Sequence, residues 1–148
     1  MKRYIVLSLA LVAALVIATA SGLNVVAHSA NVPTGIYTTT LTAADIPAEF
    51  PPEIASMLVG DWEIEFTEAG SFIVAKDGFP VVVGRYNSTS SRIVMTDLEG
   101  ALSCTDAPGI ATAIYRWTLV GNELVLTTVN ERCPGRNLVL ASHPLQRQ

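Results

Sequence analysis

The sequence is poor in the residues from which most catalytic and metal sites are built. Only two cysteines and two histidines occur among 148 residues, and of the histidines only His143 lies in the region predicted below to fold. Too few ligands remain for a zinc site. Neither a Gly-x-Ser-x-Gly elbow nor a glycine-rich phosphate loop occurs. We therefore expect no catalytic constellation, no bound metal and no cofactor.

Positive charge is also scarce once the N-terminus is set apart. Lys2 and Arg3 account for two of the nine basic residues, so residues 21–148 keep seven against thirteen acidic ones, a formal net charge of −6. Such a surface repels phosphate backbones and anionic lipid head groups. Nucleic acid is therefore not an expected partner.

The one long apolar run lies at the N-terminus. Lys2 and Arg3 precede an apolar stretch from residue 4 to about residue 20, which ends in the small-x-small triplet Ala18-Thr19-Ala20. This order is typical of a signal peptide (residues 1–20) cleaved near Ala20, and it predicts a secreted or periplasmic protein. The alternative is an uncleaved anchor formed by residues 4–27, which is long enough to span a bilayer. A membrane is an expected partner only in that case.

The cysteine pair predicts a disulfide. In an exported chain, two lone cysteines are most simply bonded to each other. Cys104 and Cys133 would close a loop of about 30 residues, worth about 3 kcal/mol in the entropic description of cross-links. Free thiols or a redox pair are the alternative, although the spacing does not fit a Cys-x-x-Cys motif.

The remaining sequence predicts a tether followed by one β domain. Residues 21–34 are small and polar, which favours a flexible tether, and the domain is expected over residues 35–148. Trp62, Ile64 and Phe66 share one face of their segment while acidic residues share the other, the period-two pattern of a half-buried strand. The predicted strands cover residues 35–41, 61–67, 71–76, 80–86, 92–96, 113–120, 123–129 and 137–141.

The connections between these strands are mostly short. Asp77-Gly78 and Gly121-Asn122 are hairpin signals because these residues tolerate the backbone of tight turns. Only residues 42–58 break the pattern, with Thr42 placed to cap a helical turn and Pro52 placed to start another. We expect an all-β fold: an antiparallel up-and-down barrel of about eight strands, with a short helical segment after the first strand. A two-sheet sandwich is the alternative.

Several short motifs resemble those of lipocalin-like (calycin-type) domains in small exported bacterial proteins. They are Gly35-x-Tyr37, Gly60-x-Trp62 with its Trp-x-Ile-x-Phe strand, and Cys133-Pro134-Gly135-Arg136 before the predicted last strand. The resemblance implies that Trp62 closes one end of the barrel with a basic residue packed across it, for which Arg136 and Arg147 are candidates. Lipocalins carry the tryptophan motif on their first strand, whereas here a strand and a helical segment precede it.

The predicted interior offers two interpretations. The inward-facing aromatic residues are either the lining of a ligand cavity or the filling of a barrel that is just wide enough for side chains. Arg85 would add a cation for an anionic head group if it points inward, whereas alternation places Arg116 in solvent. The candidate ligand-binding residues are Trp62, Phe66, Phe72, Arg85, Tyr115 and Trp117.

These features lead us to expect an exported β-barrel that binds a small apolar or amphipathic molecule. A secreted protein-interaction domain, such as a protease inhibitor that inserts its N-terminal arm, is the second hypothesis, and its protein partner is unknown. A barrel isomerase or cyclase is the third, and it would need a buried carboxyl or tyrosine with a strongly shifted pKa in a deep cavity.

Overall fold

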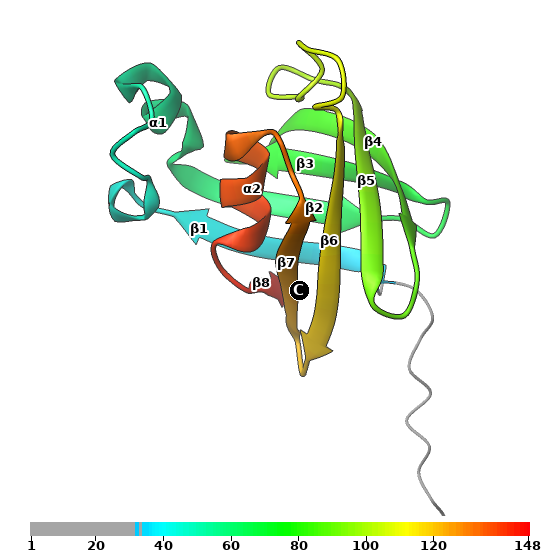
Figure 1. Ribbon diagram of the computed structural model, residues 1–148. Coiled ribbons are helices and arrows are strands. Elements are labelled where there is room, and N and C mark those ends of the chain that lie inside the picture. The colour runs from blue at the N-terminus through cyan, green and yellow to red at the C-terminus, as the bar shows by residue number, and fades with distance from the viewer. Residues whose placement is uncertain (1–31, 33) are drawn as a thin grey trace, which may run out of the picture.

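The protein is a closed antiparallel β-barrel in which every strand pairs with its neighbours in chain order (Figure 1). The computed structural model describes Val32 and residues 34–148, so the predicted signal peptide and most of the predicted tether lie outside the described residues. The strands are β1 (Gly35–Leu41), β2 (Gly60–Phe66), β3 (Ser71–Lys76), β4 (Phe79–Ser88), β5 (Arg92–Glu99), β6 (Thr112–Val120), β7 (Glu123–Asn130) and β8 (Leu145–Arg147). The barrel is therefore confirmed and the sandwich is not found.

A short last strand closes the barrel. Gln146 of β8 lies opposite Thr38 of β1 on one side and opposite Glu123 of β7 on the other. Closure of this kind leaves no unpaired sheet edge among the strands. Because successive strands run in opposite directions, the β1–β2, β3–β4, β5–β6 and β7–β8 connections all lie at one end of the barrel, here called the helical end.

The helical end carries the long connections. The 3-10 helix η1 (Ala43–Asp45) and helix α1 (Pro52–Leu58) connect β1 to β2, and helix α2 (Pro134–Ala141) connects β7 to β8. Figure 1 shows α1, α2 and the long β5–β6 loop at the same end of the barrel. The Asp45 carboxylate accepts hydrogen bonds from the backbone N–H and the hydroxyl of Thr42, both at 2.7 Å. The predicted start signals at Thr42 and Pro52 are confirmed.

The predicted eighth strand over residues 137–141 is wrong, because these residues belong to α2. Pro134 occupies the first turn, where its fixed φ suits a helix and its missing N–H costs nothing. Arg136, Val139 and Leu140 are the buried residues, a spacing of three and four that gives a helix one inner face. A run as short as Leu138-Val139-Leu140 fits both periods, so the sequence pattern could not separate them.

The folded domain begins before residue 35. Val32 is 2 % exposed and belongs to the hydrophobic core, and its backbone N–H donates to Ser88 Oγ at 2.9 Å. Ser88 ends β4, at the end of the barrel opposite the helices. Residue 32 is therefore part of the barrel's packing and not of a free tether.

One disulfide cross-links two of the connections between strands. Cys104 in the β5–β6 connection and Cys133 just before α2 form a disulfide, with Cα atoms 6.1 Å apart. It joins the two chain segments that flank the β6–β7 hairpin, as expected from the sequence.

Among the described residues, no helix has the length and apolar character needed to cross a bilayer.

Candidate functional site

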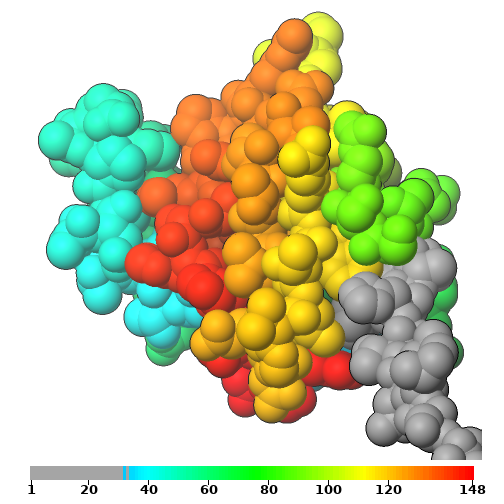
Figure 2. Space-filling model, turned by 60° about the horizontal axis from the view of Figure 1, so that its bottom comes forward, coloured from blue at the N-terminus to red at the C-terminus, as the bar shows by residue number. Residues whose placement is uncertain are grey.

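The end of the barrel opposite the helices is filled by aromatic side chains. The rings of Tyr37 and Phe66 meet edge to face with centroids 5.9 Å apart, and those of Phe66 and Tyr86 do so at 5.1 Å. Trp117 Nε1 donates to the carbonyl of Thr89 at 2.8 Å, so the indole nitrogen is satisfied within the protein. Figure 2, in which this end comes forward, shows the β6–β7 hairpin beside the C-terminal strand. This half of the interior is a packed core.

The helical half of the barrel is hollow. A cavity of about 300 Å³ extends from the helical end down to Phe72, a volume at the lower limit of typical small-molecule sites. Exposed side chains at its rim, among them Ile54 and Met57 of α1, show that it opens to solvent. The apolar residues that line it are Ile54, Met57, Leu58, Trp62, Phe72, Val74, Val82, Ala101, Leu102, Ile110, Val139 and Leu140.

Two glycines let the walls of this cavity approach closely. A Cβ on Gly84 would lie 2.2 Å from Cζ of Phe72, so the Phe72 ring packs directly over the β4 backbone at the cavity floor. Gly100 has φ +131°, and a Cβ there would lie 2.1 Å from the carbonyl oxygen of Val81. Its lack of a side chain lets the β5–β6 loop fold against β4, where Leu102 N–H donates to the same carbonyl at 3.1 Å.

The predicted site residues divide between the two halves. Trp62 and Phe72 line the cavity. Phe66, Tyr115 and Trp117 are buried but are not part of its lining. Arg85 is exposed, because Gly84 and Tyr86 on either side of it are buried and the strand alternates. The inward orientation considered for Arg85 is therefore not found, while the outward orientation predicted for Arg116 is confirmed.

The surroundings of Trp62 differ from what the lipocalin resemblance implies. Trp62 does not occupy the filled end: it lines the cavity, and its Nε1 donates to the carbonyl of Leu58 at 2.9 Å. Arg147 lies near the filled end, donating from Nη2 to the carbonyl of Thr34 at 2.9 Å. Of the two candidate partners, only Arg136 lines the same cavity as Trp62.

Arg136 is the centre of a buried ionic network beside the cavity. Its side chain is 7 % exposed and lies between the carboxylates of Glu131 and Asp97, which are 2 % and 1 % exposed. Nε and Nη2 donate to the two oxygens of Glu131, both at 2.8 Å. Nη1 and Nη2 donate to the carbonyls of Ala111 and Ile110, both at 2.7 Å. The guanidinium thus joins α2 to the end of the β5–β6 loop.

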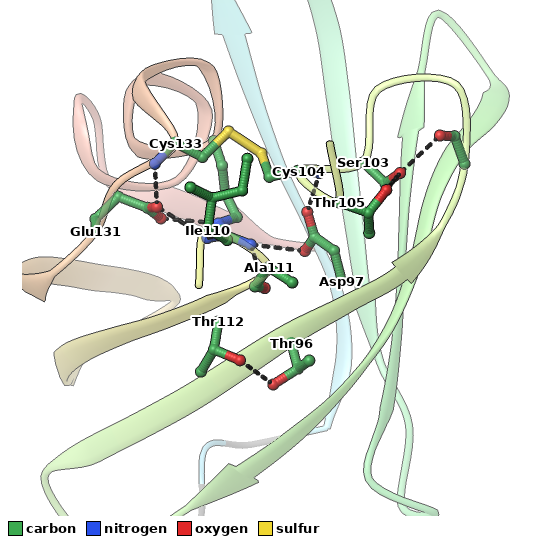
Figure 3. Close-up of polar contacts among 12 residues, drawn as sticks. Thr96, Asp97, Ser103, Cys104, Thr105, Ile110, Ala111, Thr112, Glu131 and Cys133 are labelled. Atoms are coloured by element: carbon green, nitrogen blue, oxygen red, sulfur yellow. Dashed lines mark hydrogen bonds and ion pairs between the residues drawn. A yellow bond between two sulfur atoms is a disulfide. The ribbon is translucent and has the colours of Figure 1, made fainter. Parts of the chain in front are cut away.

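The disulfide and this network support each other (Figure 3). Cys104 N–H donates to Asp97 Oδ2 at 2.8 Å, and Cys133 N–H donates to Glu131 Oε1 at 2.7 Å. Figure 3 shows Asp97 and Glu131 on opposite sides of the guanidinium nitrogens, with the disulfide above them. Each half-cystine therefore positions one of the two carboxylates, which are otherwise 34 residues apart in the numbering of the chain.

The network shifts the pKa values of Glu131, Tyr115 and Arg136. Burial opposes ionisation of Glu131, but hydrogen bonds from Arg136, Tyr115 and Cys133 outweigh it and lower the pKa of this carboxyl. Burial raises the pKa of the Tyr115 hydroxyl, and the adjacent Glu131 carboxylate raises it further. Burial also opposes the charge of Arg136, but the two carboxylates raise its pKa. The arrangement keeps the buried guanidinium charged and favours the ionised form of Glu131, which suits a structural cross-link.

The sequence of β5 contains a signal for this network, an acidic residue at an inward-facing position. Ile93, Met95 and Asp97 alternate along β5, and all three are buried. An acidic residue at an inward position must find a partner, because an unpaired buried charge is very costly. Arg136 is that partner, but its position on an inner helix face followed only from the helical conformation of α2.

The first prediction concerns acid stability. Because the pKa of Glu131 lies below its ordinary value of 4.5 in the folded protein, the unfolded chain takes up this proton more readily. The stability that ionised Glu131 contributes is fully present above pH 4.5. It is lost as the pH falls through the lower pKa that Glu131 has in the folded protein. We expect urea unfolding to show a steeper loss of stability from about pH 5 to about pH 3 in the wild type than in E131Q.

An exposed glutamate provides the matched control for this measurement. Glu63 is exposed on β2, so E63Q removes a carboxylate that is not part of the network. Its pH dependence should follow that of the wild type. Parallel wild-type and E131Q curves would show that Glu131 gains nothing from folding.

Comparisons of the chain with protein-family models, with curated proteins and with solved structures found no match. The resemblance to lipocalin-like domains therefore stays a prediction from short motifs, and the function rests on the site itself.

Proposed function

We propose that this protein is exported and that its barrel binds a small apolar or amphipathic molecule. The observation that carries the proposal is the cavity of about 300 Å³ at the helical end, in a barrel whose other end is packed with aromatic rings. A water molecule takes up about 30 Å³ in the liquid, and a methylene group is of similar size. The cavity therefore has room for roughly ten such groups. Burial of such a ligand gains roughly 25 cal/mol per Å² of apolar surface before the costs of association.

Export is part of the same proposal. It is supported by the basic, apolar and small-residue order of residues 1–20 and by the disulfide between Cys104 and Cys133, since such bonds persist mainly outside reducing compartments. The lipocalin-like motifs agree with a carrier that meets its ligand outside the cytoplasm.

The two alternative functions receive less support from the site. Among the described residues, the carboxyl and tyrosine with shifted pKa values in the buried network are Glu131 and Tyr115, and neither lines the cavity. The buried carboxyl that does line it, Asp97, is held in an ion pair with Arg136. An isomerase or cyclase would need such a group against its substrate. An inhibitor whose inserted arm reached to residue 34 would need Val32 free, whereas Val32 packs into the barrel.

A fluorescence titration tests the proposal. The neutral dye N-phenyl-naphthylamine fluoresces more strongly in apolar surroundings, and we expect it to bind residues 21–148 at one site. Ala101 is exposed and lines the cavity, so the indole of A101W should obstruct the mouth and weaken dye binding by at least about tenfold, the equivalent of about 1.4 kcal/mol.

The control uses the same loop and the same substitution. Ala107 is exposed in the β5–β6 connection but does not line the cavity, so A107W should bind the dye like the wild type. Absence of dye binding to the wild type, or equal binding by A101W and the wild type, would refute the cavity as the ligand site.

A further inference from the structure

The polar groups of the cavity indicate which ligand it accepts. Among the described residues, Arg136 is the only basic one that lines it, and a guanidinium offers five N–H donors. Four of them make hydrogen bonds to Glu131, Ile110 and Ala111. Nη1, which carries the fifth, lies 3.0 Å from Asp97 Oδ1. The charge of Arg136 is thus compensated by two buried carboxylates, and its guanidinium is not free to hold an anionic head group.

The network beside the cavity is also formally negative. One guanidinium faces two carboxylates, those of Asp97 and Glu131, which leaves an excess of one negative charge. The Tyr115 hydroxyl and two backbone N–H groups donate to these carboxylates but carry no formal charge. The network would repel an anionic ligand placed beside it, because the protein interior screens charges poorly.

One acceptor of this network is left over. Asp97 Oδ1 is buried and accepts no hydrogen bond of good geometry among the described residues, despite its ion pair with Arg136. Asp97 lines the cavity, and a buried acceptor without a donor is costly. This carboxylate therefore attracts a cationic group on the polar side of the cavity, although Oδ1 itself is covered by the protein.

The mouth of the cavity has the same sign of charge. Asp106 is exposed and lines the rim in the β5–β6 loop. A ligand that enters from solvent therefore passes one carboxylate and ends near a second, Asp97. Apolar side chains on α1, β2 and β3 form the other walls, so the ligand needs an apolar body behind its polar end.

We propose that the cavity selects a cationic amphiphile, that is, a protonated amine on an apolar body, over an anionic one such as a fatty acid. This inference rests on the proposed function, and it names the ligand class of the same cavity. The amine offsets the excess negative charge of the network and pairs with Asp106 on entry.

A competition experiment tests the selection. Residues 21–148 are loaded with N-phenyl-naphthylamine, and the dye is displaced by decylamine, decanol or decanoate at the same salt concentration and below their micelle concentrations. Because the carboxylates of Asp97 and Asp106 attract an ammonium group and repel a carboxylate, we expect decylamine to compete at least about tenfold better than decanoate, with decanol in between.

Two variants separate the site from the charge of the whole protein. D106N removes one negative charge at the mouth, and E68Q removes one from the exposed β2–β3 turn at the opposite end. D106N should reduce the preference for decylamine over decanol by about threefold, in the range of an exposed ion pair, without weakening decanol. E68Q should leave the preference unchanged.

The outcomes distinguish this inference from the proposed function. Displacement by decanol with decanoate equal to or better than decylamine would overturn the charge selection and leave the binding function standing. An equal loss of preference in D106N and E68Q would also overturn it, since general attraction would then explain the result. A wild-type protein that does not bind the dye would overturn both.

Discussion

Replacement of Arg136 by methionine (R136M) is expected to lower the free energy of unfolding by roughly 3–5 kcal/mol, the usual cost of removing one partner from a buried ionic group. Methionine fills similar space, so the loss of stability comes mainly from the polar groups that no longer have the guanidinium as their partner. The carboxyl groups of Asp97 and Glu131, with side chains 1 % and 2 % exposed, would be left buried without their cation. The carbonyls of Ile110 and Ala111 would lose their donors as well.

The measurement is urea unfolding followed by tryptophan fluorescence, with R116M as the control. Arg116 is exposed on β6, and surface substitutions of this kind usually change stability by no more than about 0.5 kcal/mol. The comparison therefore removes any general effect of losing one positive charge. If R136M were as stable as R116M, the network would be only an incidental contact and not a structural cross-link.

Removal of the disulfide is the second large effect. The double variant C104A/C133A is expected to lose about 3 kcal/mol, since the bond closes a loop of 29 residues' separation and restricts the unfolded chain. The barrel should nevertheless stay folded, because its strands form a core of their own. Circular dichroism and urea unfolding of the double variant, compared with the oxidised wild type, measure both parts of this prediction.

Reduction of the wild-type disulfide serves as an independent check on the alanine substitutions. The reduced protein should show the same loss of stability and a β-type circular dichroism spectrum at neutral pH. An unfolded spectrum for the reduced protein would show instead that the strands cannot fold without the cross-link.

The first strands were predictable because their information is local. The alternation of Trp62, Ile64 and Phe66 with acidic residues identified β2, and the Asp77-Gly78 turn placed the β3–β4 hairpin. The cysteine pairing followed from there being only two cysteines in the chain. Each of these inferences needs only neighbouring residues or a count.

The candidate site was predictable only in part. Alternation identified Trp62 and Phe72 as inward-facing, and both line the cavity. It identified Trp117 and Phe66 as inward-facing just as well, yet these residues fill the opposite half. Period two reports which face of a strand a side chain occupies, but not how far along the barrel axis the interior is filled.

The sequence alone was therefore sufficient to place most of the strands, their inward faces and the disulfide. The tertiary structure decided that residues 137–141 belong to a helix, that Arg136 meets Asp97 and Glu131, and that the helical end of the barrel is hollow while aromatic rings pack the other end. The physical reason is that strand periodicity arises between neighbours along the chain. A cavity is the volume left over by side chains from many distant segments, and only their packing together specifies it.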